Sequence, residues 1–269
     1  MLEQLSGATR VHFIVGDPIV QVKAPFGVTQ AFEALGHNAI VVPAHVSSVD
    51  LVAWVGAASL SKNVDGIIVT VPHKFACFDL CSTTSERAAF LRTVNTLRRN
   101  VDGTWHGDTF DGLGFVQALR SKGCALQGKK TLLIGAGGAG SAIAHALILA
   151  GVGKLAIHDA DTLRRPMRRN ALIERLSSLK LGKVIAGSAD PTGFDIVLNA
   201  TTIGTKRGDQ SPVDSKQFTP EMFIGCVITE PAVTPMITAA RAKGCNTLTG
   251  TDMFLGVRDL MVKFLLRRD

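Results

Sequence analysis

Tyrosine is absent from this chain of 269 residues, and aromatic residues make up only 6% of it. No apolar run reaches the length of a membrane-spanning helix, and residues 1–7 lack the basic and apolar regions of a secretory signal. These absences argue against a membrane protein and against export. We therefore expect a soluble globular protein of the cytoplasm, with a core supplied by the 46% of residues that are hydrophobic.

Cysteine is also scarce, and its pattern argues against two further classes of protein. The cysteines are odd in number and form no paired CxxC motifs, which are typical of zinc sites and redox centres. We expect reduced thiols and no bound metal. The five residues are Cys77, Cys81, Cys124, Cys226 and Cys245.

The net charge of +7 raises the question of a nucleic-acid partner. Much of the basic excess lies in short arginine pairs, without interleaved aromatic residues and without a nucleic-acid-binding motif. A solvated face, or attraction for an anionic cofactor and substrate, explains such pairs more simply. We expect a small-molecule substrate as the partner, with no nucleic acid and no membrane, and a monomer or a homodimer.

The strongest pattern in the chain lies in residues 130–161. Residues 131–134 suit a buried strand, residues 135–140 read Gly-Ala-Gly-Gly-Ala-Gly, and residues 141–150 favour a helix. A second apolar segment follows at residues 155–157. The order of strand, glycine turn, helix and strand predicts a dinucleotide-binding βαβ unit.

Each glycine of this turn has its own function in such a unit. Gly135 permits the turn, Gly137 lets the backbone approach a pyrophosphate, and Gly140 lets the helix lie close to the strand. The helix N-terminus offers free N–H groups to the phosphates. The alternative is an α/β scaffold that binds no nucleotide. The residues expected at the cofactor are Gly135, Ala136, Gly137, Gly138, Ala139 and Gly140, with His158 and Asp159 at the tip of the second strand.

Strands alternate with helices along the rest of the chain, which predicts an α/β protein with mostly parallel sheets. A polar loop is expected over residues 107–112, where two acids stand between glycines. The further strands are expected over residues 11–15, 39–42, 66–69, 94–97, 183–186, 195–199, 226–229 and 246–248.

The last helix, expected over residues 253–266, is too apolar for a free tail. We therefore expect it to pack back onto the N-terminal part of the chain. This predicts two domains: an N-terminal α/β substrate domain of residues 1–111 with residues 249–269, and a Rossmann dinucleotide-binding domain of residues 112–248.

Functional side chains of parallel sheets lie beyond the carboxyl ends of the strands. Lys74 follows such a strand, and Asp111 lies in the polar loop with two acids. Hydride transfer between an alcohol and a nicotinamide releases or takes up a proton, so it needs a titrating group near the hydroxyl. A lysine held against a carboxylate can serve, because its proton affinity responds strongly to burial. On spacing alone, the same two residues also fit a surface ion pair.

Five short motifs follow one another along the chain: Val69-Thr70-Val71-Pro72-His73-Lys74, Val94-Asn95-Thr96, Gly107-Asp108-Thr109-Phe110-Asp111-Gly112, Gly135 to Gly140, and Asn199-Ala200-Thr201. In this order they resemble the patterns NVTxPHK, VNT, GxNTDG, GAGGA and NAT of the shikimate/quinate dehydrogenase family. The resemblance covers nearly the whole chain, and the set is far more specific than the glycine turn alone.

The resemblance implies a two-domain dehydrogenase related to aromatic amino acid biosynthesis. It assigns Lys74 and Asp111 to a catalytic dyad for proton transfer and hydroxyl orientation. It assigns Thr70 and Asn95 to the hydroxyl groups of the substrate. For His73, beside the lysine, we expect a structural role.

The chain departs from the family at the substrate site. Family members carry a serine-x-serine pair whose hydroxyls hold the substrate carboxylate, and Val22 and Ala24 stand at these positions. Neither side chain can donate a hydrogen bond, so a carboxylate there would cost on the order of several kcal/mol unless Gln21 or Lys23 compensates. We expect Gln21, Val22 and Ala24 to line the substrate site. Other departures are the bulky Thr109-Phe110 in the polar loop, Thr229 in place of a tyrosine, and Val257 in place of a glutamine.

These departures predict an NAD(P)-dependent oxidoreductase of this family that works poorly, or not at all, on shikimate. The expected substrate is a cyclic polyol or hydroxy-ketone with a less polar or differently anchored substituent. Two alternatives stay open: an ordinary shikimate or quinate dehydrogenase with other carboxylate contacts, and a ligand-binding homologue without catalysis. The retained pair of Lys74 and Asp111 argues against the second, because binding alone does not require both.

NAD is the expected cofactor. Family enzymes that use NADP often carry Asn-Arg-Thr after the second strand, and the acid Asp159 stands here at the position of that arginine. A carboxylate beside a 2′-phosphate costs on the order of a few kcal/mol. NADP is the alternative if Arg164 and Arg165 fold back towards it. The resemblance also implies that Asn199 and Thr201 belong to the cofactor site.

Overall fold

The computed structural model of the chain describes residues 5–160 and 166–267. The chain divides into two compact units: a first unit, Met1–Phe110 with Val257–Asp269, and a second unit, Asp111–Gly256. The C-terminal boundary predicted from the sequence lies before the last helix, whereas the observed boundary lies inside that helix. The early turns of the helix pack in the second unit, where a β-carbon at Gly256 would lie 2.9 Å from the Gly114 carbonyl oxygen.

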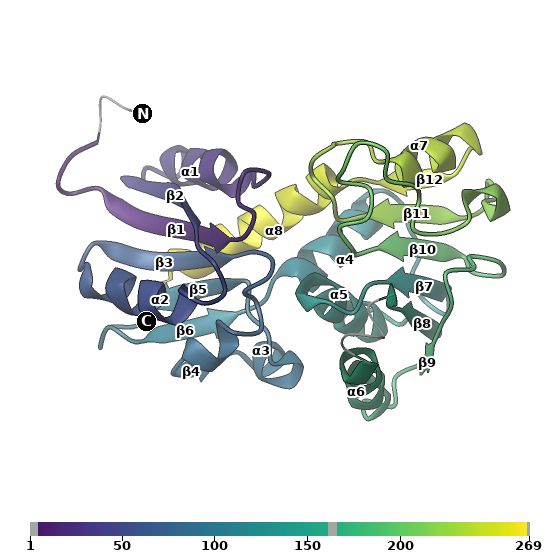
Figure 1. The fold of residues 1–269 in the computed structure, drawn as a ribbon, viewed down its shortest axis with the longest axis horizontal. Coiled ribbons are helices and arrows are strands. Elements are labelled where there is room, and N and C mark those ends of the chain that lie inside the picture. Colours follow the sequence, from purple (N-terminus) through teal and green to yellow (C-terminus); the bar gives the residue numbers. More distant parts are fainter. Residues whose placement is uncertain (1–4, 161–165, 268–269) are drawn as a thin grey trace. The chain divides into compact units, whose positions relative to one another are not determined.

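The first unit is built from β1 (Arg10–Gly16), α1 (Ala24–Ala34), β2 (Ala39–His45), α2 (Leu51–Leu60), β3 (Val64–Val69), the 3-10 helix η2 (Phe78–Leu80), β4 (Thr83–Thr84), α3 (Glu86–Leu91), β5 (Thr96–Arg99), β6 (Trp105–Asp108) and the end of α8 (Gly250–Leu265). Among the described residues, the sheet of the first unit has six strands in the order β2-β1-β3-β5-β6-β4 (Figure 1). β1 pairs with β2 and β3 in parallel, and β5 is antiparallel to both of its neighbours, β3 and β6.

The second unit contains α4 (Asp111–Ser121), β7 (Lys130–Ile134), α5 (Gly138–Leu149), β8 (Lys154–His158), α6 (Pro166–Ser177), β9 (Lys183–Ala186), β10 (Ile196–Asn199), the 3-10 helix η4 (Ser215–Gln217), β11 (Phe223–Cys226), α7 (Pro235–Ala242), β12 (Asn246–Leu248) and the start of α8. Its described strands form a parallel sheet in the order β12-β11-β10-β7-β8-β9 (Figure 1). The strand order reverses between β7 and β10. Ligands of such doubly wound sheets bind at this reversal, beyond the carboxyl ends of the strands.

The predicted bounds of a strand and of a loop were wrong. The errors concern β11 and β6, and each of these strands contains a tightly packed glycine. The strand expected over residues 226–229 is β11, which ends at Cys226. A β-carbon at Gly225 would lie 2.7 Å from Leu198 Cδ2, so the strand is closely packed there. The loop expected over residues 107–112 begins inside β6, where a β-carbon at Gly107 would lie 2.5 Å from Cys81 Sγ. Glycine is uncommon within strands, so close packing concealed both strands in the sequence.

None of the helices that the structure describes combines the length and the apolar character that a membrane span requires. Within residues 5–160 and 166–267, no three His, Cys, Asp or Glu side chains are grouped so that they could hold a metal ion. The five cysteines are free thiols, and burial raises the pKa of Cys77 and of Cys81 to about 12. These two thiols therefore stay protonated and unreactive near neutral pH.

His12 is a buried titratable group in the middle of β1. The residue is 2% exposed, its ring centroid lies 4.7 Å from that of Phe32, and Nδ1 has no hydrogen-bond partner among the described residues. Burial lowers the pKa of His12 to about 4; nearby Asp65 opposes this shift and Arg10 adds to it. The first unit therefore folds around a neutral imidazole.

This histidine should make the stability of the first unit depend on pH. As the pH falls below 6.5, the unfolded chain takes up a proton that the folded chain binds only near pH 4, so stability is lost through that window. Between pH 7 and pH 5, we expect His12 to lower the free energy of unfolding by about 2 kcal/mol. Both tryptophans, Trp54 and Trp105, pack in the core of this unit, so urea unfolding followed by tryptophan fluorescence measures the effect.

Two variants isolate the contribution of this side chain. His12→Gln should remove most of the pH dependence below pH 6.5, because glutamine does not titrate. His37→Gln, at an exposed position, should keep the pH dependence of the unmodified protein. The same loss of stability in the unmodified protein and in His12→Gln would contradict the assignment.

Candidate active site and dinucleotide site

Two loops of the first unit meet beyond the carboxyl ends of β1 and β3. The backbone N–H of Asp17 donates to the Val71 carbonyl at 3.0 Å. A β-carbon at Gly16 would lie 2.3 Å from Thr70 Cγ2, so this approach requires glycine. Thr70, predicted to bind substrate, therefore lies beside the loop between β1 and α1.

Lys74 is half-buried in the turn that follows β3. Its carbonyl oxygen accepts a hydrogen bond from Val94 N at 3.0 Å, which joins the turn to the strand region at β5. The neighbouring His73 is buried, and its Nε2 donates to the Val46 carbonyl at 2.7 Å, because a carbonyl oxygen can only accept. His73 thus anchors the turn, which agrees with the structural role expected for it.

Asn95 is buried between β3 and the loop that follows β6. Its carbonyl oxygen accepts from Val69 N at 2.7 Å. Its side-chain Oδ1 accepts from Phe110 N at 3.1 Å and from Thr96 Oγ1 at 3.0 Å. The side chain predicted to bind substrate therefore also holds the backbone just before Asp111.

The loop between β1 and α1 carries the substitutions noted in the sequence. Val22 is half-buried, and Ala24, the first residue of α1, is 3% exposed. Gln21 Nε2 donates to the Pro18 carbonyl at 2.9 Å, which fixes the orientation of the amide. Gln21 Oε1 is then a buried acceptor without a partner among the described residues. An acceptor cannot pair with a carboxylate, which also only accepts.

The bulky substitution at Phe110 lies in the interior of the first unit. Its ring centroid is 5.3 Å from that of Phe264, and the guanidinium carbon of Arg87 lies 5.0 Å from it on the ring face. Thr109, beside it, is also buried. Phe110 therefore packs within the fold, which differs from the expectation that it reshapes the substrate site.

Asp111 is the first residue of α4 and is 6% exposed. It follows Phe110, the last residue of this stretch of the first unit, by one peptide bond. The next residue, Gly112, lies against α5, where a β-carbon would come within 2.0 Å of the Ala142 carbonyl oxygen. The start of α4 is therefore fixed by a contact that admits no side chain.

The glycine turn of the second unit fits a dinucleotide. Gly135 has a φ of +104°, and a β-carbon there would lie 2.9 Å from Thr201 Cγ2. A β-carbon at Gly140 would lie 2.1 Å from the Gly135 carbonyl oxygen. At Gly137, a β-carbon would meet nothing within 4 Å, and no side chain caps the helix that follows. Open space beside an uncapped helix N-terminus suits a pyrophosphate.

Asp159 follows β8 and reaches back to this turn. Its Oδ2 accepts from Ala136 N at 2.7 Å, and the carboxylate is half-buried. His158, at the end of β8, has Nδ1 3.3 Å from the Gly187 carbonyl, so its ring is directed to the loop after β9. Arg164 and Arg165, the alternative partners of a 2′-phosphate, lie outside the described residues.

Asn199 builds the loop that follows β10. Its Oδ1 accepts from Thr201 N at 3.0 Å and from Thr201 Oγ1 at 2.7 Å. Its Nδ2 donates to the Ile203 carbonyl at 3.0 Å. This loop lies directly on Gly135. The structure thus brings together the glycine turn, Asp159 and the loop of Asn199 and Thr201 in the second unit.

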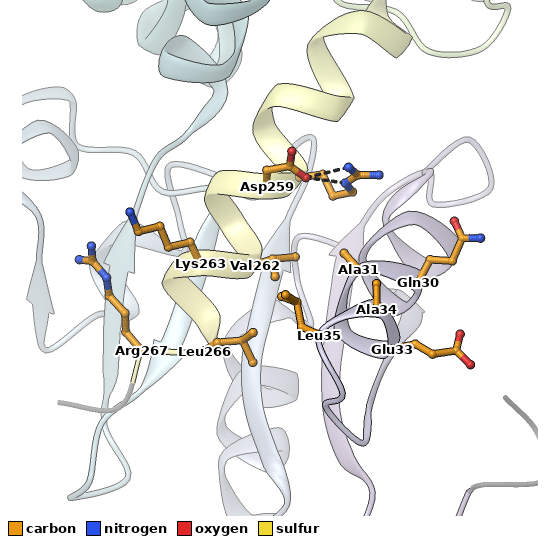
Figure 2. Close-up of a pocket in the computed structure, with 11 residues that line it drawn as sticks. Gln30, Ala31, Glu33, Ala34, Leu35, Asp259, Val262, Lys263, Leu266 and Arg267 are labelled. Atoms are coloured by element: carbon orange, nitrogen blue, oxygen red, sulfur yellow. Dashed lines mark hydrogen bonds and ion pairs between the residues drawn. The ribbon is translucent and has the colours of Figure 1, made fainter.

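The described residues also form a groove of about 880 Å³ in the first unit, between α1 and the end of α8 (Figure 2). An ion pair of Arg258 and Asp259, with an N–O distance of 2.8 Å, lies on α8 at this groove. None of the predicted site residues lines it, so it is separate from the chemistry described above. Its apolar lining comes from Ala31, Ala34, Leu35, Val262 and Leu266.

One network around the loop before Asp111 contains residues that the sequence analysis did not assign to the site. Ser85 Oγ and the Arg87 guanidinium both donate to the carboxylate of Asp108. The available signals were two acids between glycines and a helix that begins after Ser85. Neither signal distinguishes a structural carboxylate from a catalytic one.

Two protein families match this chain. Residues 14–97 match the shikimate dehydrogenase substrate binding domain, a segment that contains Thr70, Lys74 and Asn95. Residues 117–166 match the ThiF family, and this segment contains the glycine turn.

Individual proteins match over nearly the whole chain. The shikimate dehydrogenase (NADP(+)) of Rubrobacter xylanophilus is 34% identical over 259 residues, which cover 94% of this chain and 89% of the relative. The ligand-free 5-ketofructose reductase of Gluconobacter sp. strain CHM43 is 27% identical, with a TM-score of 0.81 over 97% of this chain and 94% of that one. Quinate dehydrogenase from Corynebacterium glutamicum, in complex with NAD, is 26% identical, with a TM-score of 0.83 over 96% and 94%.

Proposed function

The chain belongs to the shikimate dehydrogenase family, and from this premise we propose that it is an NAD(P)-dependent oxidoreductase whose substrate lacks the carboxylate of shikimate. The nicotinamide, when bound, supplies or accepts the hydride at a hydroxyl or ketone carbon of the substrate. The substrate is a cyclic polyol or hydroxy-ketone. The observation that carries this proposal is the pair of apolar side chains, Val22 and Ala24, in the loop between β1 and α1.

Three features of that loop argue against a carboxylate. Val22 and Ala24 have no hydrogen-bond donor in their side chains, and the free oxygen of Gln21 is an acceptor. A carboxylate facing these three groups finds no hydrogen-bond donor among them to offset its desolvation cost. A relative of the same fold, the 5-ketofructose reductase, acts by its name on a neutral sugar. A substituent without charge therefore suits this loop better than a carboxylate.

The proton in this reaction is assigned to Lys74 and Asp111. Lys74 gives a proton to the ketone oxygen as it becomes a hydroxyl, and takes it back in the reverse direction. Asp111 accepts a hydrogen bond from the hydroxyl and orients it. Thr70 and Asn95 bind further hydroxyl groups. The support is that Lys74, Thr70 and Asn95 belong to segments joined by backbone hydrogen bonds, while Asp111 directly follows the loop that Asn95 holds.

The setting of the reaction follows from the same chain. We place the enzyme in the cytoplasm, because its five thiols are free and suit a reducing compartment. We also propose that it is a monomer or a homodimer and that its partner is a small-molecule substrate.

Replacing the lysine tests the assignment of the proton. Lys74→Ala should lower kcat by roughly 100- to 10,000-fold, because general acid–base catalysis contributes about that much. The dissociation constant of the cofactor, measured by fluorescence titration, should change less than about twofold. Lys62→Ala, at an exposed lysine of the same unit, is the control and should keep full activity. Retained turnover in Lys74→Ala would remove this residue from the mechanism.

The substrate proposal is tested by comparing turnover of shikimate, quinate and 5-ketofructose. We expect efficient turnover of neither carboxylate-bearing compound. Val22→Ser combined with Ala24→Ser should raise kcat/KM for shikimate by about 10-fold or more, because a hydrogen bond to a charged group contributes about 1.5–3 kcal/mol. Efficient oxidation of shikimate or quinate by the unmodified enzyme would defeat the proposal and leave an ordinary dehydrogenase of this family.

The cofactor preference rests on Asp159, and we propose NAD. The curated relatives, the one from Rubrobacter among them, are NADP(+) enzymes by their names, which favours NADP for the family, whereas the Corynebacterium enzyme was solved with NAD. In this chain, the hydrogen bond from Ala136 N holds the Asp159 carboxylate beside the glycine turn. A negative charge there is compatible with a ribose hydroxyl and repels a 2′-phosphate.

Asp159→Asn separates charge from shape at this position. The asparagine keeps an oxygen that can accept from Ala136 N, but it removes the negative charge. We expect the unmodified protein to bind NADH more tightly than NADPH, and the variant to narrow the ratio of the two dissociation constants by about 10-fold or more. Asp190→Asn, at a carboxylate in the exposed turn after β9, serves as the control. Tighter binding of NADPH by the unmodified protein would refute the argument from Asp159.

A further inference from the structure

Arg87, in α3, makes its contacts with the three residues that precede Asp111. Its guanidinium Nη2 donates a hydrogen bond to the Asp108 carboxylate. Its Nε donates to the Thr109 carbonyl at 2.9 Å. Its guanidinium carbon lies 5.0 Å from the centroid of the Phe110 ring. One side chain therefore contacts each residue from 108 to 110.

Other groups hold the same three residues. The Asp108 carboxylate is 7% exposed and also accepts from Ser85 Oγ and from Thr109 N, the latter at 2.7 Å. Asn95 N donates to the Asp108 carbonyl at 2.9 Å, and Asn95 Oδ1 accepts from Phe110 N at 3.1 Å. The backbone leading to Asp111 is therefore fixed from both sides.

We propose that Arg87 is a positioning residue for the Asp111 carboxylate. This inference rests on the proposed function, in which Asp111 orients the reacting hydroxyl. The direction of a side chain follows its backbone, and the backbone at residue 111 continues from a loop that Arg87 holds at three consecutive residues. An error of about 1 Å in the placement of a reacting group costs on the order of 100-fold in rate. Loss of Arg87 should therefore lower kcat without changing the chemistry of Asp111 itself.

The chain offers a matched control in Arg92, at the C-terminal end of the same helix. Arg92 pairs with Asp79 at an N–O distance of 3.4 Å, and its guanidinium carbon lies 5.3 Å from the centroid of the Phe78 ring. It thus combines an ion pair with a ring contact, as Arg87 does. Its pair is well exposed, at 64% and 67%, and neither of these two contacts involves residues 108–110.

The experiment compares Arg87→Gln, Arg92→Gln, Asp111→Asn and the double variant Arg87→Gln/Asp111→Asn. Each is assayed with whichever of shikimate, quinate and 5-ketofructose the unmodified enzyme turns over fastest. Arg87→Gln should lower kcat by about 10- to 100-fold, with KM and the cofactor dissociation constant within about twofold. Arg92→Gln should keep kcat within about twofold. The double variant should be no slower than Asp111→Asn, because Arg87 acts through Asp111.

Either of two results would overturn the proposal. The first is an unchanged kcat in Arg87→Gln. The second is a double variant in which the decreases in kcat caused by Arg87→Gln and by Asp111→Asn multiply. If Arg87→Gln fails to fold, Arg87→Lys replaces it: the lysine keeps the charge for Asp108 but lacks the planar fork, so an intermediate loss of kcat is expected and full activity counts against positioning. An active Asp111→Asn would instead refute the proposed function. The two failures are therefore distinguishable.

Discussion

The site depends on how the buried carboxylate of Asp108 is satisfied. A carboxylate at the end of a strand and 7% exposed is costly unless donors surround it. Ser85, Arg87 and the N–H of Thr109 are those donors. Because they come from α3 and from the loop itself, meeting this requirement also fixes the chain just before α4. A second acid, Asp111, is the first residue of that helix.

Glycines also fix the positions of loops and helices, because they allow segments of the chain to approach each other closely. Gly16 lies close to Thr70, Gly112 to α5, and Gly135 to the loop of Thr201. At each of these positions a β-carbon would come within 3 Å of a neighbouring atom. These contacts belong to the frame that holds the predicted catalytic and cofactor residues. Residues 22 and 24 are not among the nearest neighbours of these three glycines. The part of the loop that meets the substituent of the substrate can therefore change while the frame stays the same.

Much of this architecture could be predicted from the sequence, because its signals are local. The glycine turn, the flanking strands and Asp159 lie within a short βαβ segment, and the turn after β3 carries Lys74 in a continuous motif. The contacts of Arg87 could not be predicted, because an ion pair between residues 21 positions apart leaves no periodic pattern. The boundary between the two units inside α8 was also missed, since an amphipathic pattern does not show where a helix changes its neighbours.

The most direct measurement of the central claim compares two substrates that differ only in the substituent at one position. One is shikimate, and the other is its analogue with a hydroxymethyl group in place of the carboxylate. Because Val22 and Ala24 offer the carboxylate no donor, we predict that kcat/KM is at least about 10-fold higher for the neutral analogue. A preference of the same size for shikimate would contradict the account and restore carboxylate recognition to this enzyme.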